Sequence, residues 1–209
     1  MSGKTLDGTL VEHLREGDGV IDVGANQGRV AASYARVVGP SGSVLAVEPE
    51  PTVYQDLVRG LRKWAQAHPL HAAVGDVDGQ TTVYPDGAQT SRWAALTVHQ
   101  RPGVGVPMTT LDALAPTVPR LRGIKVDVQG GEMDVLRGAT ATLRDPAIVW
   151  QLELWPHGLM TAGTSVADVC GWLAAAGLVP LTRSWDTVQQ QAAALAPTSY
   201  FDVVCRHGA

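Results

Sequence analysis

Short apolar runs alternate along this chain with longer segments whose apolar residues recur every three or four positions. The first pattern is typical of buried strands and the second of amphipathic helices. The predicted strands cover residues 19–24, 43–48, 70–75, 123–128, 147–154, 178–181 and 200–205. The predicted helices cover residues 6–15, 28–38, 51–67, 110–115, 131–138 and 165–176. Strands and helices therefore alternate over most of the sequence.

This alternation predicts an α/β fold with a doubly wound, mostly parallel seven-stranded sheet and helices on both faces. A length of 209 residues favours one domain, 1–209, over two small ones. In such sheets ligands bind beyond the carboxyl ends of the strands, beside the point where the strand order reverses. Candidate functional residues are therefore sought at strand ends.

One connection in the pattern is unusually long. Residues 81–84 alternate weakly and predict a short extra strand, and residues 86–108 then form a segment rich in glycine and proline. Connections of this length in a compact domain are unusual unless they are functional lids or disordered. We expect residues 86–108 to form a lid over a binding site; the alternative is a rigid structural loop.

Composition narrows the partners and the compartment. With 45% hydrophobic residues, 17% charged residues and a net charge of −4, the chain lacks the basic surface that nucleic acid requires. It has no apolar signal core near Met1 and no run of apolar residues long enough to span a membrane. We expect a cytoplasmic protein without nucleic-acid or membrane partners, in which Cys170 and Cys205 are buried free thiols.

The first predicted strand ends in a turn with the spacing Asp22-x-Gly24-x-Asn26-x-Gly28. A strand, such a turn, a helix and a second strand make up a βαβ nucleotide-binding unit. A dinucleotide turn needs the spacing G-x-G-x-x-G. Here Asn26 replaces the middle glycine, and Arg29, Val30 and Ala31 follow Gly28. Asn tolerates a positive φ, so this replacement is mild. The turn resembles the first motif of class I S-adenosylmethionine (SAM) methyltransferases, in which it holds the methionine end of SAM.

Two further carboxylates follow the next strands. Glu48 ends the second strand, where a carboxylate can accept both ribose hydroxyls, and Asp76 follows the third strand, where it could receive the adenine amino group. The alternatives are that the glycines serve packing, that Glu48 is merely exposed, and that Asp76 is a turn residue before Asp78-Gly79.

A wider resemblance covers roughly residues 18–157 and is carried by four spaced motifs. They are Asp22-Val23-Gly24-Ala25-Asn26, Thr110-Leu111-Asp112, Ile124-Lys125-Val126-Asp127-Val128-Gln129-Gly130-Gly131-Glu132 and Leu152-Glu153-Leu154-Trp155-Pro156. Together they resemble the FkbM family of SAM-dependent methyltransferases. This resemblance implies a Rossmann-like class I methyltransferase fold and methyl transfer to a hydroxyl of a sugar or polyketide-type product. One departure is Gln129, where the family usually has glutamate. If that glutamate has a chemical role in relatives, Asp127 or Glu132 must supply it here, or it is dispensable.

Methyl transfer to a hydroxyl requires alignment and removal of the hydroxyl proton, and the strand ends offer carboxylates for both. Asp127 ends the strand expected beside the first one, and Glu153 ends the next strand over. They are candidate catalytic residues and, together, candidate ligands of a Mg²⁺ ion that would orient the acceptor. His157 is a candidate general base. Alternatively, Asp127 caps the following helix, Glu153 is an exposed strand end and His157 lies on the surface.

Acidic strand ends and tryptophans in predicted loops, Trp93, Trp155 and Trp185, favour a saccharide acceptor, although packing of long loops explains the tryptophans equally well. Stand-alone chains of this kind resemble the mannoside methyltransferases of mycobacterial methylmannose polysaccharide assembly, a resemblance that implies a mannoside acceptor. The expected partners are a small-molecule or oligosaccharide acceptor and, at most, a second copy of the chain in a homodimer. Two other functions stay open: an NAD-dependent Rossmann oxidoreductase, and a SAM-binding module without catalysis.

Overall fold

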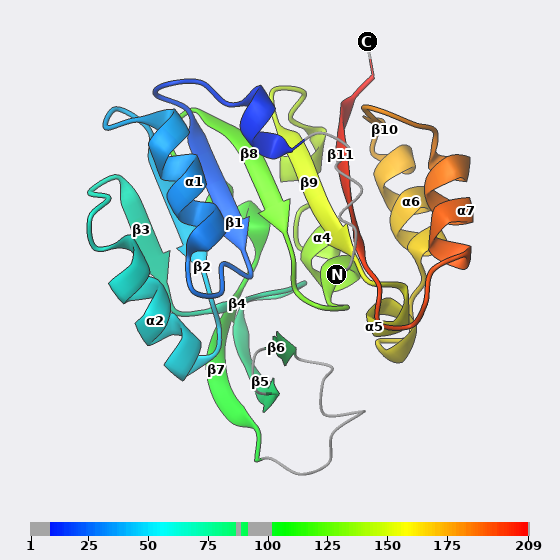
Figure 1. The fold of residues 1–209 in the computed structure, drawn as a ribbon, viewed down its shortest axis with the longest axis horizontal. Coiled ribbons are helices and arrows are strands. Elements are labelled where there is room, and N and C mark those ends of the chain that lie inside the picture. Colours follow the sequence, from blue (N-terminus) through cyan, green and yellow to red (C-terminus); the bar gives the residue numbers. More distant parts are fainter. Residues whose placement is uncertain (1–8, 87–88, 92–101, 209) are drawn as a thin grey trace.

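A computed structural model describes residues 9–86, 89–91 and 102–208. Its centre is a seven-stranded sheet with the strand order β10-β11-β9-β8-β1-β2-β3 (Figure 1). The strands are β1 (Gly19–Val23), β2 (Ser43–Val47), β3 (Ala67–Leu70), β8 (Leu121–Val126), β9 (Val149–Leu154), β10 (Leu178–Pro180) and β11 (Phe201–His207). Strands β3, β2, β1, β8 and β9 are parallel, and β11 runs antiparallel between β9 and β10. The predicted α/β fold with a mostly parallel seven-stranded sheet is confirmed.

Helices cover both faces of this sheet because successive side chains of each strand point to opposite sides. Val20 and Val44 lie in an apolar core with α1 and α2, whereas Ile21 and Val126 lie in a second core with α4, α6 and α7. The helical elements are η1 (Leu10–His13), α1 (Arg29–Val38), α2 (Pro51–Leu61), α3 (Leu111–Leu114), η3 (Ala115–Thr117), α4 (Glu132–Arg137), η4 (Thr142–Arg144), α5 (Pro156–Thr161), α6 (Val166–Ala175) and α7 (Trp185–Ala193). Within the described residues, no helix has the length and apolarity needed to cross a membrane.

A second, smaller sheet has the order β4-β7-β5-β6 and lies next to the carboxyl ends of the parallel strands (Figure 1). Its strands are β4 (Ala73–Val74), β5 (Gly79–Asp86), β6 (Gln89–Ser91) and β7 (Val104–Thr109). The short strand expected at residues 81–84 is thus part of β5. The single connection expected at 86–108 is wrong in part, because it contains β6 and most of β7. The rest of the predicted lid, residues 87–88 and 92–101, lies outside the described residues.

The third strand lies earlier in the chain than predicted, and it contains a proline. Residues 70–75 were expected to form it, but β3 is Ala67–Leu70 and the preceding helix ends at Leu61. Pro69 lies inside β3 and pairs in register with Ala46. This position tolerates a residue without an N–H because β3 is an edge strand of the sheet. The short helix α5 and the helix α7 were not predicted, and the helix expected at 6–15 is, among its described residues, only the 3₁₀ turn η1.

Candidate functional site

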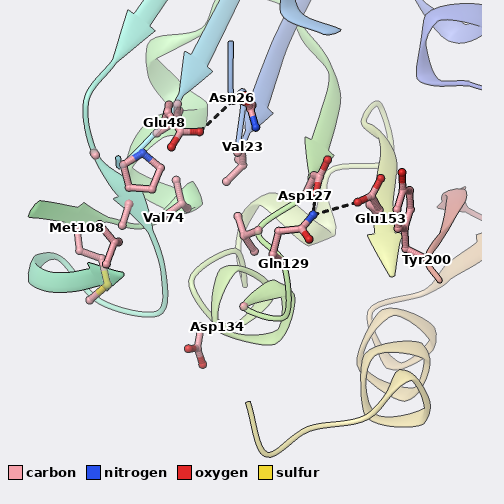
Figure 2. A pocket seen from close by; sticks show the side chains of 18 residues that line it. Val23, Asn26, Glu48, Val74, Met108, Asp127, Gln129, Asp134, Glu153 and Tyr200 are labelled. Atoms are coloured by element: carbon pink, nitrogen blue, oxygen red, sulfur yellow. Dashed lines mark hydrogen bonds between the residues drawn. The ribbon is translucent and has the colours of Figure 1, made fainter. Parts of the chain in front are cut away.

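A cavity of about 270 Å³ lies at the carboxyl ends of β1, β2, β8 and β9. Figure 2 shows side chains that line it, and residues of the smaller sheet form part of its wall. Of the predicted site residues, the cavity brings together Gly24, Asn26, Glu48, Asp127 and Glu153. The remaining lining residues are Val23, Val47, Pro49, Ala72, Ala73, Val74, Val83, Met108, Val128, Gln129, Gly131, Asp134 and Tyr200. The cavity therefore lies where the fold predicts a ligand site.

The turn after β1 forms one wall of this cavity. Gly24 has φ +79°, and a Cβ there would lie 1.9 Å from the backbone oxygen of Asp127, so the turn can approach the end of β8 only as glycine. Asn26 also has a positive φ, +50°, as expected for an Asn in place of glycine. Its backbone N–H donates to Glu48 Oε2 at 3.0 Å. The β1 turn and the end of β2 are thereby joined at the cavity.

Glu48 is only 4% exposed, yet its carboxylate faces the cavity (Figure 2). Glu50 N–H donates to Oε1 at 3.0 Å, so each carboxylate oxygen accepts one backbone hydrogen bond. Burial raises the pKa of Glu48 to about 7, and the two hydrogen bonds partly oppose that rise. Each oxygen retains a second lone pair. Glu48 can thus accept two hydroxyls, which suits the diol of a ribose.

Apolar side chains line the cavity beside Glu48. Val74, Val83 and Met108 come from β4, β5 and β7 of the smaller sheet. A flat aromatic base would find dispersion contacts here. Asp76, expected to receive the adenine amino group, is exposed in the turn between β4 and β5 and does not line the cavity. Its position follows from the earlier end of β3.

Two other residues expected to bind the cofactor lie beneath the cavity wall. Asp22 is fully buried beside Lys125, and burial raises the pKa of this carboxyl to about 6 although Lys125 lowers it. Gly28 is the N-cap residue of α1, with φ +81°, and a Cβ there would lie 2.8 Å from Leu57 of α2. Neither residue lines the cavity. Their positions indicate support and packing of the β1 turn rather than direct contact with a ligand.

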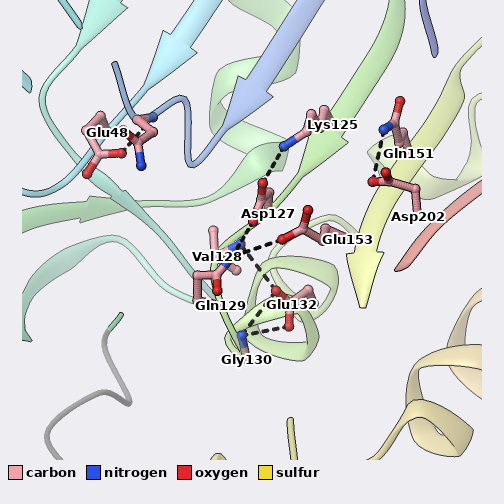
Figure 3. A network of polar contacts seen from close by, with 11 residues as sticks. Glu48, Lys125, Asp127, Val128, Gln129, Gly130, Glu132, Gln151, Glu153 and Asp202 are labelled. Atoms are coloured by element: carbon pink, nitrogen blue, oxygen red, sulfur yellow. Dashed lines mark hydrogen bonds and ion pairs between the residues drawn. The ribbon is translucent and has the colours of Figure 1, made fainter. Parts of the chain in front are cut away.

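The opposite end of the cavity is polar and contains both predicted catalytic carboxylates (Figure 3). Lys125 Nζ lies 2.7 Å from Asp127 Oδ2, and Gln129 Nε2 lies 2.7 Å from Asp127 Oδ1 and 3.1 Å from Glu153 Oε1. Burial alone would lower the pKa of Lys125, but the charges of Asp127 and Asp22 raise it above its ordinary value. Burial and then the charge of Asp127 raise the pKa of Glu153. A lysine cation and an amide thus hold two carboxylates close together.

The sequence prediction missed Lys125 as a member of this group. Its signal was present, because a strand buried on both faces is expected to be apolar, and Lys125 stands between Ile124 and Val126. In register, Lys125 lies beside Asp22 of β1 and Gln151 of β9, so these three side chains share one face of the sheet. A buried lysine in such a row indicates carboxylates nearby.

The loop between β8 and α4 is fixed by Glu132. This side chain is fully buried, and its carboxylate accepts Gly130 N–H at 3.0 Å and Val128 N–H at 3.2 Å. Burial raises the pKa of Glu132 to about 7. Gln129, between the two donors, has φ +56°. Glu132 therefore shapes the loop that carries Gln129 into the cavity.

His157 and a bridging metal fit this geometry less well. His157 lies in α5 with its ring 5.6 Å from that of Trp155, and it does not line the cavity. Among the described residues, no three His, Cys, Asp or Glu side chains are grouped to hold a metal. Both oxygens of Asp127 already accept hydrogen bonds, and the Gln129 amide occupies the space between Asp127 and Glu153. This arrangement does not fit a Mg²⁺ ion shared by the two carboxylates.

The tryptophans expected to face a sugar serve other contacts. Trp155 donates to the Pro197 carbonyl at 2.6 Å, Trp185 begins α7 and donates to the Leu178 carbonyl at 3.1 Å, and Trp93 lies outside the described residues. The aromatic ring at the polar end of the cavity is instead that of Tyr200, which is 40% exposed. Cys170 and Cys205 are buried free thiols, as predicted.

The sequence itself identifies the family once this site is known. A sequence profile described as the methyltransferase FkbM domain matches residues 22–178, which include the β1 turn, Glu48 and the polar end of the cavity. The chain belongs to the FkbM methyltransferase family. The resemblance inferred from the spaced motifs is therefore confirmed.

Solved structures agree on the fold. A methyltransferase FkbM from Methylobacillus flagellatus KT matches 93% of this chain and 44% of its own with a TM-score of 0.60 at 13% identity. The Aeropyrum pernix fibrillarin, solved with natively bound S-adenosyl-L-methionine, matches 97% of this chain and 70% of its own with a TM-score of 0.54 at 16% identity. This FkbM chain thus spans less than half the length of the FkbM structure that it matches, and the likeness at these identities concerns the fold.

Proposed function

We propose that this chain is a SAM-dependent O-methyltransferase that methylates a hydroxyl of a saccharide. The observation that carries the proposal is a single cavity with a diol acceptor, Glu48, toward one end and a pair of carboxylates, Asp127 and Glu153, at the other. The first suits a nucleoside and the second suits a hydroxyl that must lose a proton. Membership in the FkbM family supports the same reaction class.

The cofactor end is assigned residue by residue. Glu48 would accept the ribose hydroxyls, the turn at Gly24 and Asn26 would hold the methionine portion, and Val74 and Met108 would contact the adenine. When bound, SAM supplies an electrophilic methyl group on a sulfonium. The observation that argues most directly for a ligand concerns Glu48: each of its oxygens accepts one backbone N–H and keeps a lone pair for one more hydrogen bond.

Asp127 and Glu153 would act on the acceptor hydroxyl. Lys125 fixes Asp127 by a 2.7 Å ion pair, so this carboxylate can orient the hydroxyl without moving. Glu153 is the proton acceptor of the pair, because burial and the charge of Asp127 raise its pKa above that of an ordinary glutamate, and a base works best when its pKa lies near the working pH. His157 is not needed in this assignment.

The end of the cavity that contains Asp127 and Glu153 has both carboxylates and an aromatic ring, and this combination supports a saccharide as the acceptor. Carboxylates accept hydrogen bonds from neighbouring sugar hydroxyls, and the exposed face of Tyr200 offers an apolar surface to the C–H groups of a sugar ring. A flat apolar acceptor would displace water from Asp127 and Glu153 and offer no hydroxyls to their remaining lone pairs, at a cost in free energy. A saccharide satisfies both surfaces, and a mannoside is the narrower case.

Radiolabelled SAM, incubated with the chain and a panel of mono- and oligosaccharides, tests this proposal. We expect label on a subset of sugars, including mannosides, as an ether stable to mild base, which distinguishes it from a methyl ester. SAM binding without transfer to any sugar would instead support a binding module. Transfer only to non-sugar hydroxyls would keep the O-methyltransferase and overturn the saccharide.

A further inference from the structure

The side-chain amide of Gln129 lies between the two carboxylates at the polar end of the cavity (Figure 3). Its nitrogen is 2.7 Å from Asp127 Oδ1 and 3.1 Å from Glu153 Oε1. An atom that bridges two carboxylate oxygens at these distances must be a donor, and the amide nitrogen carries two protons, one for each. Gln129 therefore does by hydrogen bonding what a cation does by charge: it holds two negative groups together.

The surrounding charges leave little need for a second cation. Asp127 Oδ2 is paired with Lys125 Nζ at 2.7 Å, and that lysine is buried, so its charge acts across a poorly screened distance. A divalent ion placed between Asp127 and Glu153 would displace the amide and would be repelled by Lys125. The local geometry thus favours the amide over a metal.

The backbone also holds the amide in this position. Glu132 accepts the N–H of Val128 on one side of Gln129 and of Gly130 on the other, and Gln129 itself has φ +56°. Gly130, with φ +108°, would bring a Cβ within 2.6 Å of the Gly158 carbonyl, so the loop packs directly against α5. The amide is therefore placed by the fold of the loop rather than by a mobile side chain alone.

We infer that Gln129 is a positioning residue that takes the place of a divalent cation, so that Asp127 and Glu153 act on the acceptor without a metal between them. The inference rests on the proposed function for the role of the two carboxylates. One consequence of the inference is independent of the proposed function. Gln129→Glu replaces the two N–H donors with a third carboxylate and creates a set of oxygen ligands of the kind that binds Mg²⁺ or Mn²⁺.

Mn²⁺ binding, measured by electron paramagnetic resonance in the absence of SAM and sugar, tests this consequence. The matched control is Gln190→Glu, which adds the same charge on the exposed surface of α7. We expect Gln129→Glu to bind Mn²⁺ about tenfold or more tightly than the wild type and the control, because a third carboxylate is added to the ligand set. Equal binding by all three proteins overturns the inference.

The wild-type chain gives a second test that does not depend on how the variant folds. We expect Mn²⁺ binding to be as weak in the wild type as in Glu153→Gln. Wild-type binding that is lost in Glu153→Gln would place a metal between the carboxylates and overturn the inference. Because no acceptor is present, a chain that methylates no sugar contradicts the proposed function and leaves the Mn²⁺ result to decide on Gln129.

Activity gives the third test. Transfer to the best acceptor is expected to be unchanged within about twofold when Mg²⁺ is replaced by a chelator, since no cation takes part. Gln129→Met keeps the length of the side chain and removes its donors. We expect the acid limb of its kcat profile to move to higher pH, because the two carboxylates then repel each other without compensation, while SAM affinity is retained. A chelator-sensitive wild type, or a Gln129→Met profile that does not move, contradicts the inference.

Discussion

Glu48 is buried, and its carboxylate can still accept hydrogen bonds from a ligand in the cavity. A carboxylate that loses water without gaining donors is costly, and the N–H groups of Asn26 and Glu50 offset that cost at 3.0 Å each. Burial still raises its pKa to about 7. The residue is thus held in one orientation before any ligand arrives, and its open lone pairs face the cavity.

Replacing Glu48 by alanine should therefore weaken SAM binding. Each charge-assisted hydrogen bond to the ribose is worth about 1.5–3 kcal/mol, so titration calorimetry should show at least a tenfold rise in the dissociation constant. The control is Glu16→Ala, which removes an exposed glutamate away from the cavity. SAM affinity that is the same in both variants would refute the ribose assignment.

The variant Asp127→Asn tests whether this carboxylate is needed for methyl transfer and not for SAM binding. The change keeps the size of the side chain and removes the charge that pairs with Lys125 and orients the acceptor. Turnover should fall by ~10²-fold or more while SAM binding stays nearly intact. Asp186→Asn on the exposed surface of α7 is the matched control and should keep full turnover. Wild-type turnover in Asp127→Asn would contradict a role for this carboxylate. His157, or the close approach of acceptor and SAM alone, would then remain as the explanation of catalysis.

Elements differ in how well the sequence predicted them. The apolar runs of β1, β2, β8 and β9 are flanked by glycine, aspartate or proline and were placed to within two residues, because strands buried on both faces are mostly apolar. Strands β3 and β7 were not predicted at their observed residues because they contain Pro69 and Pro107, and proline normally interrupts a strand. Pro69 is at a sheet edge, and Pro107 lies just beyond the pairing of β7 with β4, which involves only Met108 and Thr109.

The site also contains residues whose positions could be predicted from the sequence and residues whose contacts could not. The positions of Gly24, Glu48, Asp127 and Glu153 could be predicted because each is fixed relative to the end of a parallel strand. The contact of Gln129 with Glu153 could not, because it depends on a positive φ in the β8–α4 loop and on a partner in another strand. Asp76 was misplaced together with the strand before it.

The β8–α4 loop should make stability depend on pH through Glu132. Its pKa is raised to about 7 in the folded chain, so below its unfolded value of about 4.5 both states are protonated, and between these values the folded state binds the proton more tightly. The free energy of unfolding contributed by Glu132 therefore falls as the pH rises from about 4.5 to about 7 and is level above that.

Denaturant unfolding of Glu132→Gln at several pH values measures this contribution by difference. The glutamine keeps an acceptor for the loop but does not titrate, so the stability of the variant relative to the wild type should rise between pH 5 and pH 7. Glu12→Gln, an exposed residue of η1, serves as the control. A difference between variant and wild type that is constant with pH would mean that Glu132 keeps the same protonation in both states.

At the scale of the whole molecule, the cavity lies between the large sheet and the smaller one. Its walls come from the carboxyl ends of the large sheet and from Val74, Val83 and Met108 of the smaller one. A ligand that fills the cavity contacts both, so binding should stabilise the chain as a unit rather than one element of it.

Thermal unfolding with SAM and with NAD distinguishes the cofactors. A ligand at one hundred times its dissociation constant adds about 2.7 kcal/mol to the stability of the folded state. We expect SAM to raise the midpoint of unfolding by several degrees and NAD at the same concentration to leave it unchanged. A rise with NAD alone would favour an oxidoreductase.

The proline in β3 has a counterpart at the other edge of the sheet, where Pro180 ends β10 opposite Cys205. An edge strand is where a sheet can be extended by another chain, and a residue without an N–H interrupts the row of donors that such an added strand requires. Both outer strands are also short. We therefore expect any homodimer to form through helices or loops, and the native sheet to resist the edge-to-edge growth that leads to fibrils.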